Sequence, residues 1–377
     1  MSKMTSPFSK LPLSFFYFFT LMPFHVISQS PATTADQTTL LNLKKLWQSP
    51  PWTASWNSSS SPCTWPATEC TAGTVTGLLL HDKNITDTIP PLMCDLKNLT
   101  VLDLSYNYLQ GDFPTVLYNC SGLQYLDLSR NFFVGPIPSD IDRLSSLQFI
   151  NVGGNNFSSE IPPAISRLPE LRTLYLYENQ FNGTVPIEIG NLANLVNLGM
   201  AYNTMLSPSI IPIEFVNLKK LEFLWMTRTN LIGKIPDSFA NLSNLQHLNL
   251  SRNNLDGPLP QGLFQLKNLS VVYLYKNYLS GEIPTPIESL NLIGVDLSEN
   301  NLTGSIPQRL FQLKNLKIII LNKNQLSGEI PTLIESLKLI KLDLSMNNLT
   351  GSIPMDLWKL QQLAQLVLFS NNFSGCL

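Results

Sequence analysis

Two aspartates in the sequence have the spacing that a pair of catalytic carboxylates could have. Asp103 and Asp127 occupy the same place in two copies of the segment LDLS, 24 residues apart. On neighbouring strands their side chains would lie about 5 Å apart, close enough to share a proton. The same Asp recurs at positions 296 and 343. We therefore interpret it as part of a repeated pattern and not as a catalytic dyad.

Other residue types that support catalysis are scarce. The chain has three histidines, and neither His81 nor His247 has a Ser or Cys nearby in a nucleophile motif. The sequence contains no glycine-rich phosphate loop and no zinc-binding HExxH segment. We predict that the protein is not an enzyme and that it uses no cofactor and no metal.

Aromatic and basic residues recur at positions that alternate with leucine. Such positions point to one face of a sheet, and aromatic and arginine side chains dominate binding hot spots. The predicted ligand-contacting residues are Tyr175, Tyr177, Tyr202, Trp225, Arg228, His247, Arg252, Tyr273, Tyr275 and Lys276. The alternative is that these side chains only shield the sheet. Five strands about 4.8 Å apart would make a track of roughly 20 Å, which fits about six residues of an extended peptide.

These positions belong to a repeat with the pattern LxxLxLxxNxLxGxIPxxLxxLxx. Its first leucine stands at positions 99, 123, 147, 171, 195, 221, 245, 269, 292, 316, 339 and 363, so the steps are 23 or 24 residues, with one of 26. This period is typical of leucine-rich repeats. A looser copy begins near Val75, which gives about thirteen repeats over residues 75–377, the last one incomplete. We predict an α/β solenoid, a horseshoe or superhelix with a parallel concave β-sheet and short helical or 3-10 turns on the convex side.

Each position of the repeat has a physical role. In LDL at 102–104 the two leucines point into the core and the residue between them points out. The Asn that follows can bond the turning backbone of its own and the adjacent repeat, and Thr229 replaces it once. The Gly before IP permits a turn that other residues resist. The Asn ladder is predicted at positions 107, 131, 155, 179, 203, 253, 277, 300, 324, 347 and 371.

Residues 29–74 are predicted to form a cap that covers the first repeat. A short amphipathic helix would carry Leu40, Leu43 and Leu46 on one side. Four tryptophans that follow would cover the end of the core, namely Trp47, Trp52, Trp56 and Trp65.

Five cysteines are compatible with disulfides in an exported protein. Cys63 and Cys70 are close enough for a local disulfide, and a zinc site is the alternative, although no further ligands lie nearby. Cys94 and Cys120 precede the first leucine of successive repeats, so they could be joined across one repeat step. Cys376 would then be left unpaired.

The two ends of the chain carry further signals. Residues 1–28 have the layout of a secretory signal peptide, with an apolar run at Leu11–Ile27 and cleavage after Ser28; an uncleaved anchor is the alternative. No later apolar run is long enough to cross a membrane. The final repeat stops where the next coil would cover its apolar residues, which predicts a frayed end at Leu363, Leu366, Leu368 and Phe373.

Charge and glycosylation signals also favour an extracellular protein. The formal net charge is −2 and 13% of residues are charged, so no basic surface for a nucleic acid is expected. Predicted N-glycosylation sites are Asn57, Asn84, Asn98, Asn119, Asn156, Asn182, Asn241, Asn268, Asn301, Asn348 and Asn372. A twelfth sequon, at Asn249, falls on a concave strand, where a glycan would obstruct the groove.

The chain after the leader resembles the extracellular part of plant leucine-rich-repeat receptor-like kinases. The resemblance depends on LxGxIP and on the Cys-rich cap, and three segments narrow it to the HAESA and HAESA-like subgroup: Ile89–Asn131, Ala201–Phe215 with its two-residue insertion, and Leu221–Phe239 with WMT. It implies a plant-type solenoid that binds a small secreted peptide on its concave face and recruits a co-receptor leucine-rich-repeat kinase. It also implies secretion to the apoplast, or the plasma membrane if the chain is part of a longer receptor.

The chain departs from this family in several places. Tyr273 stands where the family's proline pocket has a Glu, and the RxR motif that holds a peptide's carboxylate is absent. The transmembrane and kinase regions are also absent, so the sequence reads as a truncated receptor. Alternatives are an extracellular enzyme inhibitor that resembles polygalacturonase inhibitors and a non-functional gene fragment.

Overall fold

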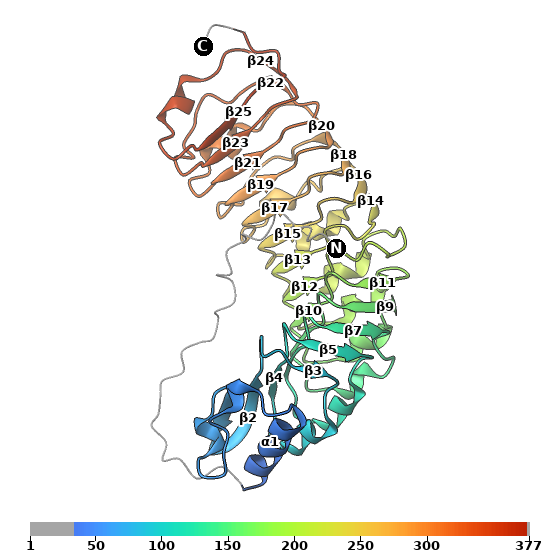
Figure 1. The fold of residues 1–377 in the computed structure, drawn as a ribbon. Coiled ribbons are helices and arrows are strands. Elements are labelled where there is room, and N and C mark those ends of the chain that lie inside the picture. The colour runs from blue at the N-terminus through green and yellow to red at the C-terminus, as the bar shows by residue number, and fades with distance from the viewer. Residues whose placement is uncertain (1–33, 375–377) are drawn as a thin grey trace, which may run out of the picture.

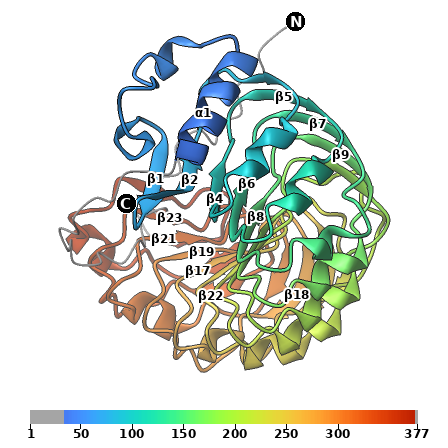
Figure 2. The same ribbon diagram turned by 90° about the horizontal axis from the view of Figure 1, so that it is seen from below.

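The computed structural model describes residues 34–374, so the predicted signal peptide and Cys376 lie outside the described residues. The chain winds into a solenoid in which each coil stacks on the preceding one (Figure 1). In the view of Figure 2, strands line the inner side of the arc and short helical turns line its outer rim. This arrangement confirms the solenoid with a concave sheet that the repeat pattern predicts.

A 14-stranded sheet covers the concave side. β1 and β2 pair antiparallel, and β2 begins the parallel series with β4 and β6. In the repeat strands the middle residue is buried and its two neighbours point to the concave side. The strands are β1 (Thr68–Thr71), β2 (Thr74–Leu79), β4 (Val101–Asp103), β6 (Tyr125–Asp127), β8 (Phe149–Asn151), β10 (Thr173–Tyr175), β12 (Asn197–Gly199), β13 (Phe223–Trp225), β15 (His247–Asn249), β17 (Val271–Tyr273), β19 (Gly294–Asp296), β21 (Ile318–Ile320), β23 (Lys341–Asp343) and β25 (Gln365–Val367).

Short strands on one flank of the solenoid form further parallel sheets, which were not predicted. They are β3 (Thr86–Asp87), β5 (Tyr108–Gly111), β7 (Phe132–Gly135), β9 (Asn156–Glu160), β11 (Gln180–Asn182), β14 (Ile232–Lys234), β16 (Asn254–Pro258), β18 (Tyr278–Glu282), β20 (Asn301–Thr303), β22 (Ser327–Glu329) and β24 (Asn348–Thr350). The series is interrupted between β11 and β14, where the repeat of 26 residues places an isolated bridge between Ser209 and Leu231.

The convex side consists of 3-10 turns, as predicted. They are η3 (Pro91–Asp95), η4 (Thr115–Asn119), η5 (Ile141–Arg143), η6 (Pro163–Arg167), η7 (Ile187–Asn191), η8 (Ile213–Asn217), η9 (Asp237–Asn241), η10 (Leu263–Gln265), η11 (Gln308–Gln312) and η12 (Met355–Lys359). A proline precedes or begins many of these turns, since its fixed φ suits the first position of a helical turn.

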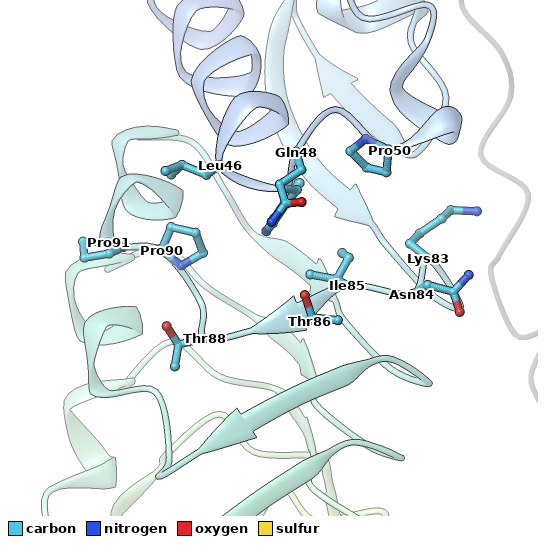
Figure 3. Close-up of a pocket in the computed structure, with 11 residues that line it drawn as sticks. Leu46, Gln48, Pro50, Lys83, Asn84, Ile85, Thr86, Thr88, Pro90 and Pro91 are labelled. Atoms are coloured by element: carbon cyan, nitrogen blue, oxygen red, sulfur yellow. The ribbon is translucent and has the colours of Figure 1, made fainter.

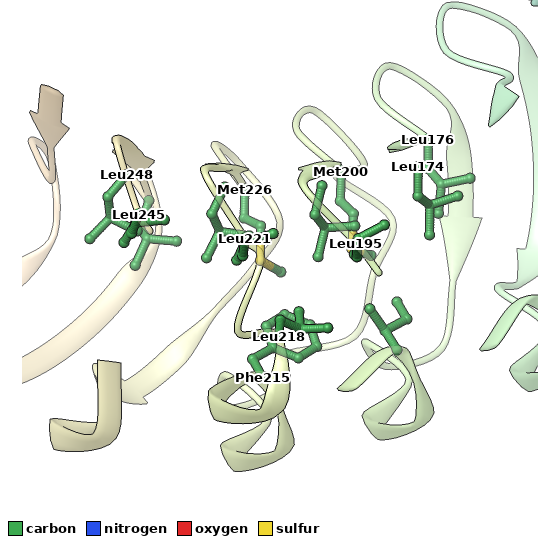
Figure 4. Packing of buried hydrophobic residues seen from close by; sticks show 14 of the residues in the cluster. Leu174, Leu176, Leu195, Met200, Phe215, Leu218, Leu221, Met226, Leu245 and Leu248 are labelled. Atoms are coloured by element: carbon green, nitrogen blue, oxygen red, sulfur yellow. The ribbon is translucent and has the colours of Figure 1, made fainter. Parts of the chain in front are cut away.

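The core is a stack of apolar layers, one for each coil. Strand leucines such as Leu174 and Leu248 are fully buried, and Phe215 and Leu218 are buried on the side of the 3-10 turns (Figure 4). Each fully buried side chain of this size contributes roughly 1.5–3 kcal/mol, so stability accumulates along the stack.

The asparagine ladder forms as predicted. Asn179 donates to the carbonyls of Val152 and Leu176 and accepts from the N–H of Phe157, so one side chain joins two coils. The hydroxyl of Thr229 donates one such hydrogen bond, to the carbonyl of Met226. The neighbouring Asn203 has a buried Oδ1 without a partner among the described residues, so the ladder is weakest beside the long repeat.

The amino-terminal cap contains α1 (Thr34–Leu46) and the short turns η1 (Pro51–Thr53) and η2 (Pro62–Thr64). Leu40 and Leu43 are fully buried. The prediction that Leu46 shares their face is wrong: it is 59% exposed, because a residue six positions after Leu40 lies about 120° away around a helix. The tryptophans cover the core as expected, and Trp56 stacks on Trp65 with ring centroids 5.4 Å apart.

Two disulfides lie at this end of the solenoid. One joins Cys63 to Cys70 within the cap, and the other joins Cys94 to Cys120 on successive coils. At the opposite end, apolar residues that would be buried in a central coil remain half-buried, namely Leu363, Leu366, Leu368 and Phe373.

Candidate functional site: the concave face

Each coil presents one residue in a left-handed backbone conformation just before the ladder position. The φ angle is +55° at Arg228 and +57° at Arg252. This backbone geometry is shared along the concave side, so we name these residues the left-handed row. Its members are Asp82, Tyr106, Arg130, Gly154, Glu178, Tyr202, Arg228, Arg252, Lys276, Glu299, Lys323, Met346 and Ser370.

A continuous series of rings runs along the concave strands beside this row. We name it the aromatic track, and it consists of Tyr125, Phe149, Tyr175, Tyr177, Tyr202, Phe223, Trp225, His247 and Tyr273. Neighbouring ring centroids are 4.1 Å apart at Tyr125 and Phe149 and 5.5 Å apart at Tyr177 and Trp225. The ring centroids of His247 and Tyr273 are 6.0 Å apart. All of these rings are half-buried, so each has a face or edge available to a ligand.

Glycines in the strands make room for two of these rings. A Cβ at Gly153 would lie 2.5 Å from the ring of Tyr177, and a Cβ at Gly199 would lie 2.8 Å from the ring of Tyr175. Both tyrosines therefore lie over the backbone of a neighbouring coil. A side chain at either glycine would displace the ring that lies over it.

Most charged residues of the left-handed row are paired with each other. Arg130 donates to Glu178 at 2.5 Å, and its guanidinium lies 5.7 Å from the ring centroid of Tyr177. Glu299 accepts from Lys276 at 3.4 Å and from Lys323 at 3.3 Å. Within the described part of the chain, neither Arg228 nor Arg252 has a carboxylate within 4 Å.

Burial changes the acid–base behaviour of several groups in the groove. It raises the pKa of Asp127 to about 6, and Asp103 acts in the same direction. Burial lowers the pKa of His247 to about 4 and raises the pKa of Tyr175 to about 12. His247 and Tyr175 are therefore neutral near pH 7.

The two aspartates of the possible dyad accept hydrogen bonds from the residues that follow their strands. Asp103 accepts from the N–H and hydroxyl of Ser105, and Asp127 does the same with Ser129. The second oxygen of Asp127 accepts from Asn151. These bonds agree with the interpretation of the aspartates as part of the repeat.

The structure brings most of the predicted binding residues together. The predicted residues Tyr175, Tyr177, Tyr202, Trp225, His247 and Tyr273 all belong to the aromatic track. Tyr275 lies beneath the guanidinium of Arg252 at 5.7 Å, whereas Lys276 is engaged with Glu299. Arg228 is exposed, and within residues 34–374 its guanidinium lies over no aromatic ring.

Sequence reasoning missed three rings of the track. Tyr125, Phe149 and Phe223 stand at the first position of their strands, one residue before the buried leucine or isoleucine. The same alternation that identified Tyr175 places them on the concave side, so the signal was present. Phe223 stacks on His247 at 4.7 Å and links the two halves of the track.

A hollow lies between the cap and the first repeat, away from the concave strands. It has a volume of 500 Å³ and is lined by the end of α1 and by residues that follow β2, among them Leu46, Gln48 and Lys83 (Figure 3).

The predicted glycosylation positions differ sharply from Asn249 in exposure. All eleven predicted asparagines have exposed side chains. Asn249 is half-buried on β15, and its Oδ1 accepts from Thr227 and from the N–H and hydroxyl of Ser251.

Searches of residues 34–374 gave two negative results. No cluster of His, Cys, Asp and Glu side chains is arranged to bind a metal ion. No helix in this range combines the length and apolar character needed to span a bilayer.

Family profiles described as leucine rich repeat match most of the repeat region. One profile matches residues 75–133 and 97–157, and a second matches 170–192, 220–242, 244–266, 291–313, 315–337 and 338–360. Together they span more than half of the chain, and neither describes an enzyme.

Several plant proteins are similar to this chain in sequence or structure. The complex of the Arabidopsis receptor kinase HAESA with the peptide hormone IDA and the co-receptor SERK1 superposes with a TM-score of 0.81 at 32% identity, over 91% of this chain and 63% of that chain. Receptor-like protein 52 of Arabidopsis thaliana is 46% identical over 81 residues, 21% of this chain and 10% of its own. Polygalacturonase inhibitor 2 of the same plant is 41% identical over 71 residues, 18% of this chain and 22% of its own. The chain therefore spans less than two thirds of each of these proteins.

Proposed function

Because the chain belongs to the leucine-rich-repeat family, and its structure resembles the ectodomains of plant receptor kinases, we propose that it is an extracellular, receptor-like protein that binds a secreted peptide. The peptide lies in extended form along the concave face. The observation that carries this proposal is the aromatic track, which is continuous from Tyr125 to Tyr273. The protein performs no catalysis in this role.

The track sets the length of peptide that it accommodates. It crosses β6, β8, β10, β12, β13, β15 and β17. Strands lie about 4.8 Å apart, so the track is roughly 29 Å long and matches about nine extended residues at ~3.3 Å each. Rings that are half-buried and already in contact lose little conformational entropy when a ligand covers them, which favours binding.

The similarity to the HAESA complex supports the same type of ligand and partner. HAESA binds the peptide hormone IDA together with the co-receptor SERK1. We place the chain in the HAESA and HAESA-like subgroup and propose that a co-receptor of this kind joins the peptide-bound form. A signal peptide over residues 1–28 would deliver the protein to the apoplast.

Direct binding measurements test this proposal. Titration calorimetry with the IDA peptide and with a pool of random nine-residue peptides should detect binding that a Trp225→Ala variant weakens roughly 10- to 100-fold. Tyr278→Ala is the matched control, because Tyr278 is an exposed tyrosine on the flanking strand β18. Absence of binding to all of these peptides, or equal loss in both variants, would show the proposal to be wrong.

A second candidate function is inhibition of a cell-wall-degrading enzyme. It is favoured by the segment that is 41% identical to Polygalacturonase inhibitor 2. Fungal polygalacturonase activity measured with increasing amounts of the protein separates the two functions. Inhibition without peptide binding would favour this alternative.

A further inference from the structure

We propose that Arg228 and Arg252 form a subsite for a carboxylate of the bound peptide. This inference rests on the proposed peptide-binding function and specifies the ligand chemistry at one part of the groove. The two arginines follow neighbouring strands, β13 and β15, and share the left-handed backbone, with φ of +55° and +57°. Strands are about 4.8 Å apart, so the two side chains start close enough to hold one anion.

Arg228 and Arg252 differ from the other basic residues of the left-handed row, which form ion pairs. Arg130 is neutralised by Glu178, and Lys276 and Lys323 share Glu299. Arg228 and Arg252 have no ion pair with any described carboxylate. The positive charge in the middle of the groove is therefore available to a ligand.

Neighbouring phenols complete the subsite. The guanidinium of Arg252 lies over the ring of Tyr275 at 5.7 Å, which limits its movement. Tyr202 lies close enough to be affected by both cations: burial raises its pKa, whereas Arg252 and Arg228 act to lower it. The two guanidinium groups provide the donors that a carboxylate requires, beside the phenols of Tyr202 and Tyr275.

The position of the subsite predicts the form of the ligand. It lies beside Trp225, whose ring is 6.0 Å from the ring of Tyr202. A peptide that covers the aromatic track with apolar residues would therefore present an acidic group to the arginines. That group is either an Asp or Glu side chain or the carboxyl terminus of the peptide.

Selection from two peptide libraries tests the inference. Random nine-residue peptides with a blocked carboxyl terminus and the same peptides with a free one are each selected on the full secreted chain and on the variant Arg228→Gln/Arg252→Gln. In the blocked library the wild type should enrich Asp or Glu at one position. If the carboxyl terminus of the peptide is the natural ligand group, the wild type should instead retain peptides from the free-terminus library and not from the blocked one. The double variant should bind peptides without either preference.

Affinity measurements on one selected peptide complete the test. Replacement of its acidic group by the corresponding amide should weaken binding to the wild type roughly 10- to 100-fold and leave binding to the double variant unchanged. Lys323→Gln, from the same row, is the control and should retain the acid preference. Peptide binding without an acid preference, or a preference that persists in the double variant, overturns the subsite alone. Failure of the wild type to retain any peptide overturns the proposed function, and the subsite with it.

Discussion

The ring of Tyr177 lies directly over the backbone of Gly153 in the preceding coil. A Cβ at Gly153 would lie 2.5–2.7 Å from three ring carbons, a separation that real side chains do not tolerate. The absence of a side chain at one position therefore fixes an aromatic ring that belongs to the next repeat. The same ring touches Trp225 and lies 5.7 Å from the guanidinium of Arg130, so it joins the aromatic and charged parts of the groove.

Substitution of Gly153 by Ala should impair binding without unfolding the coil. The new methyl group forces the Tyr177 ring upward and breaks its contact with Trp225, which we expect to lower peptide affinity about 10-fold. The cost to stability should stay near 1 kcal/mol, because the ring can move into the open groove. Gly122→Ala is the matched control, since its Cβ would meet only a backbone oxygen at 3.7 Å. Equal affinities of the two variants in titration calorimetry would contradict this prediction.

Replacement of His247 by Phe should reduce the loss of stability in acid. Burial lowers the pKa of His247 to about 4, whereas an unfolded histidine titrates near 6.5. Between these pH values the unfolded state takes up a proton that the folded state does not, so the histidine costs up to about 3 kcal/mol as the pH falls from 6.5 to 4. Phe keeps the stacking on Phe223 and cannot titrate. The difference between the melting temperatures at pH 7 and pH 4.5 should be smaller in His247→Phe than in the wild type. A control variant with the same substitution at the exposed His81 should behave like the wild type.

Replacement of Asp127 by Asn should have the opposite pH dependence. Burial raises the pKa of Asp127 to about 6, so the folded state keeps a proton that the unfolded state releases near 3.8. The stabilising contribution is present below pH 3.8 and is lost as the pH rises through 6. We expect Asp127→Asn to stabilise the protein by about 1–2 kcal/mol at pH 7, because Asn249 occupies the same strand position and bonds Ser251 in the same way. Urea unfolding that shows the same gain at pH 4 would exclude this explanation.

Glycosylation should avoid Asn249. Asn249 is half-buried on its strand and its Oδ1 accepts from Thr227 and Ser251, whereas the asparagine of the sequon at Asn268 is exposed. After secretion from plant cells, Asn268→Gln should remove the mass of one glycan and Asn249→Gln should leave the glycan mass unchanged. Intact-protein mass spectrometry before and after enzymatic deglycosylation measures both. A glycopeptide that carries sugar on Asn249 would disprove the prediction.

The disulfide between coils should stabilise the protein more than the one inside the cap. Cys94 and Cys120 are 26 residues apart, whereas Cys63 and Cys70 are separated by 7. Loop-closure entropy then assigns roughly 3–4 kcal/mol to the longer link and about 1 kcal/mol less to the shorter one. Hydrogen exchange on the two double-Ala variants should show faster exchange confined to the first repeats, with the larger effect for Cys94→Ala/Cys120→Ala. A smaller effect for that pair would argue against the entropic account.

Much of the fold follows from the sequence because one physical constraint recurs in every coil. The alternation around Leu174 predicts its strand, and Asn179 predicts the ladder bond to the preceding coil. The flanking strands were not predicted, because a three-residue segment such as Ile232–Lys234 has no fully buried residue and pairs only after the coils have stacked.

The sequence predicted most residues of the candidate site but not how their side chains are oriented and paired. Alternation identifies Tyr177 as a concave residue, yet its orientation depends on the missing side chain of Gly153 in another coil. In the same way, sequence alone does not reveal that Lys276 is held by Glu299 while Arg252 is free of ion pairs. These properties depend on which side chains the stacking brings within reach of each other.

Residues of the left-handed row can differ widely without changing the backbone of the coil. The coil imposes a positive φ on residues as different as Tyr202, Arg228 and Glu299, so the backbone accepts each of them at a similar cost of about 1 kcal/mol. Substitution within this row changes the concave surface and leaves the buried leucines and the ladder as they were. Gene duplication followed by drift at these positions would thus yield new recognition surfaces while the underlying solenoid stays constant.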